Sequence, residues 1–161
     1  MEKPSEIWQP ETMPAMLIGR AAHMLARIAD ARLRDLGLAI AQIPVFVALK
    51  DGSRLSQKEL ARLAGVEQPS MAQLLARMER DGLIRREADP TDKRSSLISL
   101  TDRALDKLAP GRAVLSQGNR EALAGFDDGD VEKLIELLGR VIGNLGDAGG
   151  CPAAKHGGTA R

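Results

Sequence analysis

Aromatic side chains are almost missing from this chain of 161 residues. Phe, Trp and Tyr make up 2% of the sequence, and there is no tyrosine. A hydrophobic content of 43% can nevertheless form a core, so the composition argues against global disorder. Such a core must consist of Leu, Ala, Val, Ile and Met, which favours packed helices over a β-sandwich.

The sequence also has only one cysteine, no long apolar run and a small net charge. The single cysteine, Cys151, excludes an intramolecular disulfide and is typical of a reducing compartment. No segment approaches the ~18 apolar residues of a membrane span, and the acids and prolines at the N-terminus do not resemble a signal peptide. We therefore expect a cytoplasmic protein. The net charge is +1, so a DNA-binding hypothesis must rest on where the charges lie.

The length suits one compact domain. Residues 1–13 are a proline-punctuated arm with one large anchor, Trp8. A helical pattern then runs from Pro14 to about Leu36, with Gly37 as its stop. At roughly 1.5 Å per residue this helix is ~35 Å long. A domain of this size cannot cover such a helix completely, so we expect its apolar stripe to meet a partner chain; that stripe contains Met16, Leu17, Ala21, Met24, Leu25 and Ile28.

Two further helices are predicted after a short apolar helix over residues 43–52. Ser56 is a good N-cap, and Glu59 three residues later completes a capping box. Leu60 and Leu63 should face inward, and a glycine ends the helix. The next helix starts near Gln68 and has a proline in its first turn, where the missing N–H costs nothing. Two helices joined by a short glycine-containing turn are typical of a helix-turn-helix.

The second of these helices, residues 68–80, has two distinct faces. Its predicted buried face contains Met71, Leu74, Leu75 and Met78. The opposite polar stripe contains Ser70, Gln73, Arg77 and Arg80. Side chains of these types can read base edges or contact phosphates. An ordinary solvated helix face would have the same pattern, so the stripe needs the support of its neighbours.

A charged hairpin follows the helix. LIRREA and SSLISL are short alternating runs that read as two strands, with DPTDKR as the tip. An exposed arginine on a narrow ribbon can enter the minor groove. We expect Asp92 to orient Arg94 through a charge-assisted hydrogen bond. A merely soluble turn is the alternative interpretation of the same charges.

Two more helical stretches complete the chain. Thr101 or Asp102 caps the first, which Pro110-Gly111 interrupts or bends before it continues to about Leu123. The last runs over residues 128–145 with one apolar side. The Gly/Ala-rich segment 147–161 is expected to be a flexible tail.

Together these residues resemble the MarR family of bacterial transcription regulators. The matching stretch covers residues 36–104, and its specific features are the EQPSM helix start and the D-x-R wing tip formed by Asp92 and Arg94. The resemblance implies a mainly α fold with a small β-hairpin wing, that is, a winged helix-turn-helix with N- and C-terminal dimerisation helices. Residues 38–101 would form the DNA-binding region, and residues 14–37 with 102–146 would form the helical dimerisation region.

The resemblance also implies a homodimer that binds a pseudo-palindromic operator in double-stranded DNA, with half-sites roughly 10 bp apart. Such a protein would be cytoplasmic and nucleoid-associated when bound, and repression is the family's commoner activity. Carried over by position, the residues that would contact the DNA backbone are Ser56, Gln57 and Lys58. Those that would contact the major groove and nearby phosphates are Pro69, Ser70, Gln73 and Arg77, and those for the minor groove are Lys93 and Arg94. The predicted DNA-binding set also contains Gln68, Asp92 and Ser95.

Many relatives are released from DNA by small aromatic acids, so the resemblance implies a small-molecule effector. Arg20, His23 and Arg27 recur on one face of the first helix and could bind a carboxylate, with Phe46 covering an aromatic ring. Alternatively, these arginines are solvated or pair across a dimer, and His23 is an interface residue. Redox sensing through Cys151 lacks a basic environment for the thiol, and the histidines and the cysteine are too scattered for a metal site.

Other functions are weighed against this one. A winged helix can serve as a protein-interaction module, because a fold does not determine a function. A regulator with no small-molecule effector is a further alternative. The sequence has no nucleophile–base–acid arrangement, phosphate-cradling glycine loop or metal-ligand cluster, so an enzyme is not expected.

Overall fold

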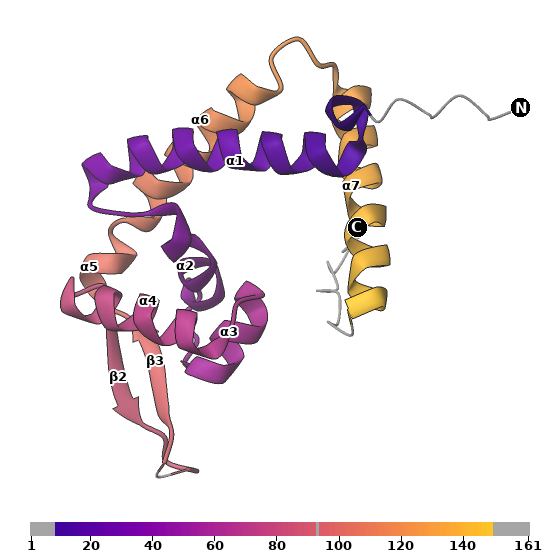
Figure 1. Ribbon diagram of the computed structural model, residues 1–161. Helices are drawn as coiled ribbons and strands as arrows, with labels where there is room; N and C mark the ends of the chain where they lie inside the picture. The colour runs from indigo at the N-terminus through magenta and orange to yellow at the C-terminus, as the bar shows by residue number, and fades with distance from the viewer. Residues whose placement is uncertain (1–8, 93, 150–161) are drawn as a thin grey trace, which may run out of the picture. The chain divides into compact units, whose positions relative to one another are not determined.

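A computed structural model describes residues 9–92 and 94–149 (Figure 1). They form two compact units, one extending to Asn119 and one beginning at Arg120. Trp8, Lys93 and Cys151, for which the sequence analysis made predictions, lie outside the described residues. The helices are η1 Pro10–Thr12, α1 Pro14–Leu33, η2 Arg34–Leu36, η3 Ile40–Gln42, α2 Ile43–Leu49, α3 Gln57–Ala64, α4 Gln68–Arg80, α5 Asp102–Leu105, α6 Leu108–Ala122 and α7 Asp128–Gly149; the strands are β1 Leu55–Ser56, β2 Ile84–Ala88 and β3 Ser96–Leu100.

The first long helix has the predicted bounds, although its last turn tightens into the 3-10 helix η2. Gly37 ends it with a left-handed φ of +66°, a conformation that glycine adopts without a steric penalty. Only the C-terminal part of α1 is buried, through Ala29 and Leu33. The predicted apolar stripe is largely exposed, with Met16 at 54% and Leu17 at 50%. Within this chain, therefore, most of the stripe is uncovered.

The helix-turn-helix is formed by α3 and α4. The backbone N–H of Ser56 donates to Glu59 Oε2 at 2.8 Å, and the Glu59 N–H donates to Ser56 Oγ at 3.3 Å, which confirms the capping box. The prediction for Leu63 was wrong, because this side chain is 52% exposed. The buried residues of α3 are instead Leu60 and Ala61. They are neighbours in the sequence, whereas the predicted pair was three residues apart.

The predicted hairpin is confirmed as β2 and β3, which pair antiparallel from Ile84 opposite Leu100 to Ala88 opposite Ser96. Figure 1 shows this hairpin extending away from α3 and α4. A third strand, β1, pairs with β3 and gives the sheet order β1-β3-β2. The sequence analysis missed β1 because two residues are too few to produce an alternating pattern.

After the wing, the helical break lies earlier than predicted. Thr101 caps α5, accepting from the Ala104 N–H at 3.2 Å. The chain then breaks at residues 106–107, and Pro110-Gly111 lies inside α6 rather than interrupting it. Pro110 is the third residue of α6, where backbone N–H groups have no partner within the helix, so the missing donor costs little.

The core of the first unit is aliphatic, as the composition predicted. Phe46 is the single aromatic side chain of that cluster among the described residues. The largest fully buried side chains come from α1, α2, α3, α4 and the sheet; they include Leu33, Leu49, Leu60, Met71, Leu75, Met78 and Ile98. This core fixes the inner face of α4 against the rest of the winged region.

The second unit consists mainly of α7, which extends four residues beyond the predicted end. Its start is closed by Asp127, whose Oδ1 accepts from the Asp130 N–H at 2.8 Å. Along the helix, Ile135, Ile142 and Leu145 are 64–67% exposed. Its apolar side is therefore uncovered in a single chain. Among the described residues, the helices are all too short or too polar to cross a membrane.

Candidate nucleic-acid interface

Helix α4 presents the two faces that its sequence predicts. Met71, Leu75 and Met78 have no exposed surface, and Leu74 is half-buried. On the other side, the polar stripe formed by Ser70, Gln73, Arg77 and Arg80 is exposed along its whole length. Because the inner face is locked into the core, the outer stripe is held in a fixed orientation. Rigid elements of this kind position side chains more accurately than loops do.

The first residues of α3 and α4 meet. Gln57 Nε2 donates to Gln68 Oε1 at 3.3 Å, which joins two residues that the sequence assigned separately to the DNA-contacting set. Lys58 and Pro69 are exposed beside them. Ser56 is already engaged, because its hydroxyl donates to Glu59 Oε2 at 2.8 Å. Its side chain is therefore part of the α3 cap, and a contact with the DNA backbone would have to compete with that bond.

The Ser56 interactions also change the acidity of Glu59. Hydrogen bonds from the Ser56 backbone N–H, and then from its hydroxyl, lower the pKa of the Glu59 carboxyl below its usual value. Both donors stabilise the charged carboxylate. The capping box is consequently present in its ionised form at neutral pH.

The wing tip is ordered by aspartate side chains that accept backbone hydrogen bonds. Asp89 Oδ1 accepts from the Thr91 hydroxyl at 2.6 Å, from the Thr91 N–H at 2.8 Å and from the Asp92 N–H at 3.3 Å. The two Thr91 bonds lower the pKa of the Asp89 carboxyl. The Ser95 N–H closes the turn on the Asp92 carbonyl at 2.9 Å. The sequence analysis treated the tip only as a group of charges. The spacing of two residues between Asp89 and Thr91 is the local signal for an Asx-type turn.

Asp92 does not act on Arg94 in the predicted way. The Oδ1 atom of Asp92 accepts a hydrogen bond from the backbone N–H of Arg94 at 3.0 Å, rather than from the Arg94 guanidinium. The carboxylate therefore shapes the chain at the tip, while the Arg94 side chain is left exposed. The short reach of an aspartate favours such a bond to a backbone group two residues ahead.

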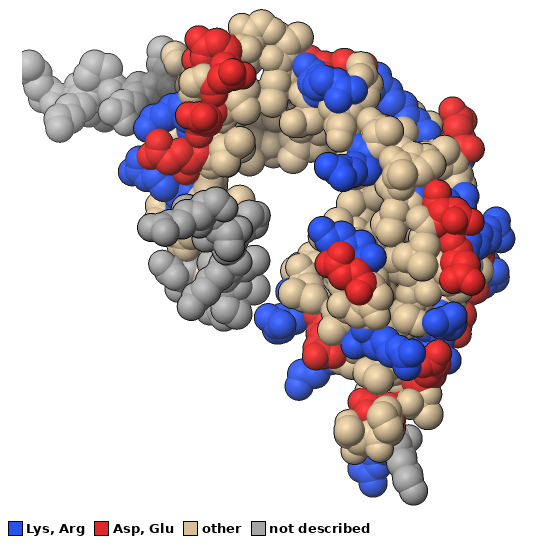
Figure 2. All heavy atoms as spheres, turned by 180° about the vertical axis from the view of Figure 1, so that it is seen from behind, with Lys and Arg blue, Asp and Glu red and all other residues tan. Residues whose placement is uncertain are grey.

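Ion pairs join β2 to α4 and to the segment before β1, and sequence periodicity gave no signal for them. Arg86 Nε on β2 lies 3.0 Å from Glu79 Oε2 on α4. Arg54, which precedes β1, reaches Glu87 on β2 at 2.8 Å. Arg85 lies 3.4 Å from the same carboxylate and donates to Ser99 Oγ at 3.2 Å. On the face shown in Figure 2, acidic and basic side chains are intermixed and do not form one broad basic area.

A cavity of about 930 Å³ lies in the first unit between α2 and α6. Phe46 lines it, whereas Arg20, His23 and Arg27 do not; all three are exposed on α1. The basic side chains at the cavity are instead Lys50, Lys107 and Arg112. The three predicted residues share a helix face, but that face does not adjoin Phe46.

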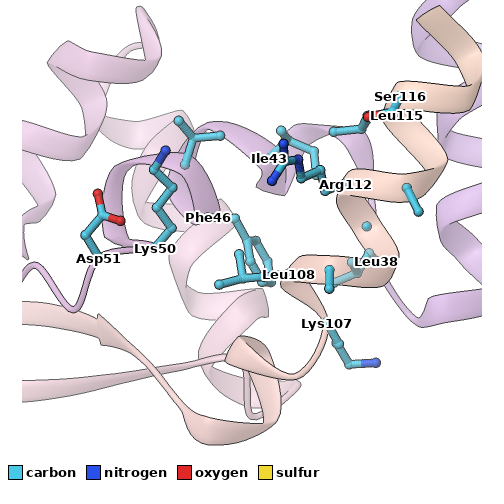
Figure 3. A pocket seen from close by; sticks show the side chains of 14 residues that line it. Leu38, Ile43, Phe46, Lys50, Asp51, Lys107, Leu108, Arg112, Leu115 and Ser116 are labelled. Atoms are coloured by element: carbon cyan, nitrogen blue, oxygen red, sulfur yellow. The ribbon is translucent and has the colours of Figure 1, made fainter. Parts of the chain in front are cut away.

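The cations at the cavity differ in their availability. Figure 3 shows Arg112 reaching from α6 toward Ile43, while Lys107 runs away from Phe46 and Leu108. The Lys107 ammonium donates to the Leu36 carbonyl at the end of η2. Arg112 is exposed, and no ion pair or hydrogen bond is recorded for it within residues 9–92 and 94–149. In the same part of the chain, no cluster of three or more His, Cys, Asp or Glu side chains could hold a metal ion.

Known proteins are similar to this chain in sequence and in fold. A sequence model of the MarR family matches residues 36–95. A probable transcriptional regulator from Pseudomonas aeruginosa is 28% identical, with a TM-score of 0.75 over 83% of this chain and 99% of that one. A MarR mutant from E. coli complexed with operator DNA is 22% identical, with a TM-score of 0.76 over 86% and 99%. A protein from Listeria monocytogenes described as a MarR family regulator, complexed with 26mer DNA, is 21% identical, with a TM-score of 0.77 over 85% and 91%.

These likenesses point to regulators rather than to enzymes. The matched segment contains the capped α3, the two-faced α4 and the wing tip, which are the parts described above. The likeness in fold extends well beyond that segment, to 83% of the chain for the Pseudomonas aeruginosa structure. Residues 36–95 of the chain therefore match the MarR family, and the chain has the winged-helix fold of these transcriptional regulators.

Proposed function

We propose that this regulator binds a specific DNA sequence, as a homodimer on a pseudo-palindromic operator, and represses transcription there. The observation that carries the proposal is the geometry of α4, whose exposed polar stripe is backed by the fully buried Met71, Leu75 and Met78. Two of the structurally similar proteins are complexed with DNA, which supports the same interpretation.

Within this proposal, α4 enters the major groove and the wing probes the adjacent minor groove. Gln73 can bind an adenine through both groups of its amide, and Arg77 suits guanine or phosphate. Arg94 stands on a tip that Asp89 and Asp92 already order. Little entropy is then lost at the wing on binding, because the turn is formed beforehand.

The homodimer rests on the uncovered apolar surface of α1 and α7. Met16 and Leu17 on α1, and Ile142 and Leu145 on α7, are each at least half exposed. Large apolar surfaces that are exposed in a single chain typically mark association sites. We expect sedimentation equilibrium to give a dimer for the unaltered protein. Ile142→Glu should weaken it measurably, and a monomer at micromolar concentration would contradict the assembly.

A small carboxylate effector is the proposed release signal. Its site would be the α2–α6 cavity, where Phe46 and Leu108 offer apolar contacts. Lys107 is committed to the Leu36 carbonyl, which leaves Arg112 and Lys50 as cations for the carboxylate, and we propose Arg112. A guanidinium recognises a carboxylate through two parallel hydrogen bonds. The test is whether Arg112→Gln reduces release by an aromatic acid while leaving DNA affinity in the absence of the acid unchanged.

The deciding experiment measures fluorescence anisotropy of the full chain on DNA from upstream of its own gene. Salt is fixed, and excess nonspecific DNA is present. Saturable binding that survives the competitor supports the proposal. If this DNA fails, a selection from a random DNA library follows. Absence of enrichment in that selection would overturn sequence-specific binding and favour a protein-interaction module.

Two variants then test the mechanism. Gln73→Ala should cost ~1–3 kcal/mol of binding free energy, mainly at one base position, and Arg94→Ala should weaken binding to many sequences alike. Arg34→Ala is the matched control for charge, because Arg34 is an exposed arginine on η2 outside the proposed interface. Equal losses for Arg34→Ala and Arg94→Ala would show that only net charge matters.

A further inference from the structure

The winged region is connected to α1 and to α6 at two places that lie side by side. The chain enters the region through residues 36–38, after η2, and leaves it through residues 106–107, between α5 and α6. The Lys107 ammonium donates to the Leu36 carbonyl and so links the two connections. One turn further along α6, a Cβ atom added to Gly111 would lie 3.4 Å from Leu38 Cδ1. We call residues 36–38 together with residues 107–111 the joint.

The entry side of the joint is braced by the backbone. The Leu38 N–H donates to the last residue of α1 at 3.0 Å, and the Ile40 N–H donates to Asp30 Oδ1 at 2.8 Å. These bonds hold the start of the winged region on the end of α1. On the exit side, the recorded backbone hydrogen bonds of residues 106–111 are local, to carbonyls one turn back. The Lys107 side chain therefore makes the link across the joint.

Helix α6 is lightly attached to the first unit, so the contacts of the joint matter for its position. Its buried residue is Gly111, and the apolar side chains that pack against the core are only half-buried; these are Leu108, Val114 and Leu115. The Leu36 carbonyl lies at a helix end, where carbonyls have no partner within the helix. A lysine at such an end also interacts favourably with the helix dipole.

The joint is at the same time part of the wall of the α2–α6 cavity. Leu38, Lys107 and Gly111 all line that cavity. Figure 3 shows the Lys107 nitrogen directed away from Phe46, so its carbon stem borders the cavity while its ammonium binds the Leu36 carbonyl. A molecule that fills the space between α2 and α6 therefore contacts the joint directly.

We propose that Lys107 is a latch that holds α6 against residues 36–38 in the arrangement that binds DNA, and that a molecule in the cavity opens it. The winged region and α6 then turn relative to each other at residues 106–107. This inference rests on the proposed function and supplies its switching step. Lys107 is a positioning residue, because it acts through the placement of α6 and contacts no DNA. An occupant shifts the equilibrium by as much as it prefers the open joint.

The first variant removes the latch. Lys107→Met keeps an apolar stem and loses the donor. The latched fraction should fall with the loss of a charged hydrogen bond, and DNA affinity should fall by about threefold to tenfold. Lys107→Arg keeps a cationic donor and should restore most of the affinity. Lys50→Met is the matched control, because Lys50 is an exposed lysine that lines the same cavity. It should leave DNA affinity unchanged.

The second variant opens the joint from the other side. Gly111→Leu builds an apolar side chain into the cavity wall next to Leu38, and so takes the place of an occupant without any added molecule. It should lower DNA affinity at least as much as Lys107→Met does. Gly118→Leu is its control on the same helix, because a Cβ atom there would meet no described atom within 4 Å.

Two measurements are made on the full-length chain and each variant. Fluorescence anisotropy gives the affinity for a DNA sequence that the unaltered protein enriches from a random library. Hydrogen exchange, followed by mass spectrometry, reports opening of the joint without any DNA. In Lys107→Met and Gly111→Leu, exchange should become faster in peptides that cover the joint. It should stay unchanged in α3 and α4, because their packing does not depend on the latch.

Faster exchange at the joint together with weaker DNA binding, in both variants and in neither control, supports the inference. Faster exchange with unchanged DNA affinity would make Lys107 a purely structural contact. Unchanged exchange in Lys107→Met would show that no latch exists. Faster exchange throughout α3 and α4 would mean that Lys107 supports the whole winged region, which also overturns the latch. No enrichment by the unaltered protein would instead overturn the DNA-binding function, while exchange still decides whether the latch exists.

Discussion

Two residues of α4 that stand only two positions apart should respond to truncation in opposite ways. Leu75 has no exposed surface, and Gln73 is exposed on the polar stripe. We expect Leu75→Ala to destabilise the fold strongly. We expect Gln73→Ala to leave stability unchanged and to reduce DNA affinity. The pair therefore separates the structural face of the helix from its binding face.

The expected size of the Leu75→Ala effect follows from its burial. Truncation removes three carbon groups from the core, which at ~0.8 kcal/mol for each buried CH₂ costs about 2.4 kcal/mol. The cavity left behind raises the loss toward ~5 kcal/mol where the surroundings cannot relax. Gln73→Ala should stay within about 0.5 kcal/mol, as surface substitutions usually do. A loss of about 2.4 kcal/mol is large for a domain whose total stability is ~5–15 kcal/mol.

The free energies of unfolding of Leu75→Ala and Gln73→Ala are measured by urea unfolding, which is followed by far-ultraviolet circular dichroism. All samples need the same protein concentration, because the stability of a dimer depends on it. The slope of free energy against urea should agree between variants, since a changed slope would indicate a changed unfolded state. A Leu75→Ala loss below about 1 kcal/mol, or a Gln73→Ala loss above it, would refute the assignment of the two faces.

Three further predictions concern the contacts that position the interface. Ser56→Ala should cost ~1 kcal/mol in urea unfolding, because it removes the N-cap of α3. The folded-state pKa of Glu59 is lowered, so the ionised Glu59 side chain contributes to the free energy of unfolding above the unfolded pKa of about 4.3, and this contribution is lost as pH falls through the folded value. The difference in stability between wild type and Glu59→Gln should therefore shrink below about pH 5. A difference that stays constant with pH would contradict this. A double-mutant cycle on Glu79 and Arg86, whose side chains are 45% and 27% exposed, should give a coupling of ~0.2–1 kcal/mol; zero coupling would mean that the pair does not brace the wing.

The sequence predicted the parts of the fold that depend on neighbours along the chain. The capping box of Ser56, the end of α3 at Gly65 and the pairing of β2 with β3 each have a signal within a few residues. The polar stripe of α4 was found in the same way. The error at Leu63 shows the limit of this reasoning, because an eight-residue helix has too few turns to define its buried direction by periodicity.

Contacts between distant segments could not be predicted. The Glu79–Arg86 pair joins different elements, and the bond from Lys107 to the Leu36 carbonyl spans 71 positions. The same limit explains the proposed effector site. Arg20, His23 and Arg27 were grouped because they share a helix face, whereas the cavity beside Phe46 takes its cations from α2 and the α5–α6 region. Which helices surround a cavity is a property of the tertiary fold.

The ion pairs of the winged region also limit how strongly binding can depend on salt. Three arginines already pair with acidic side chains, namely Arg54, Arg80 and Arg86. While those pairs persist, these arginines do not neutralise DNA phosphates. The cations left for DNA among the predicted contacts are Lys58, Arg77, Lys93 and Arg94. Eight such charges in a dimer, at ~0.9 for each phosphate neutralised, give a slope of about −7 for log K against log salt concentration.

If the three arginines leave their partners on binding, the slope approaches about −13. We expect the shallower value in anisotropy titrations between ~50 and ~200 mM salt, because opening a pair leaves a carboxylate beside the phosphates. A slope steeper than about −10 would show that the pairs open and that the wing reorganises on DNA.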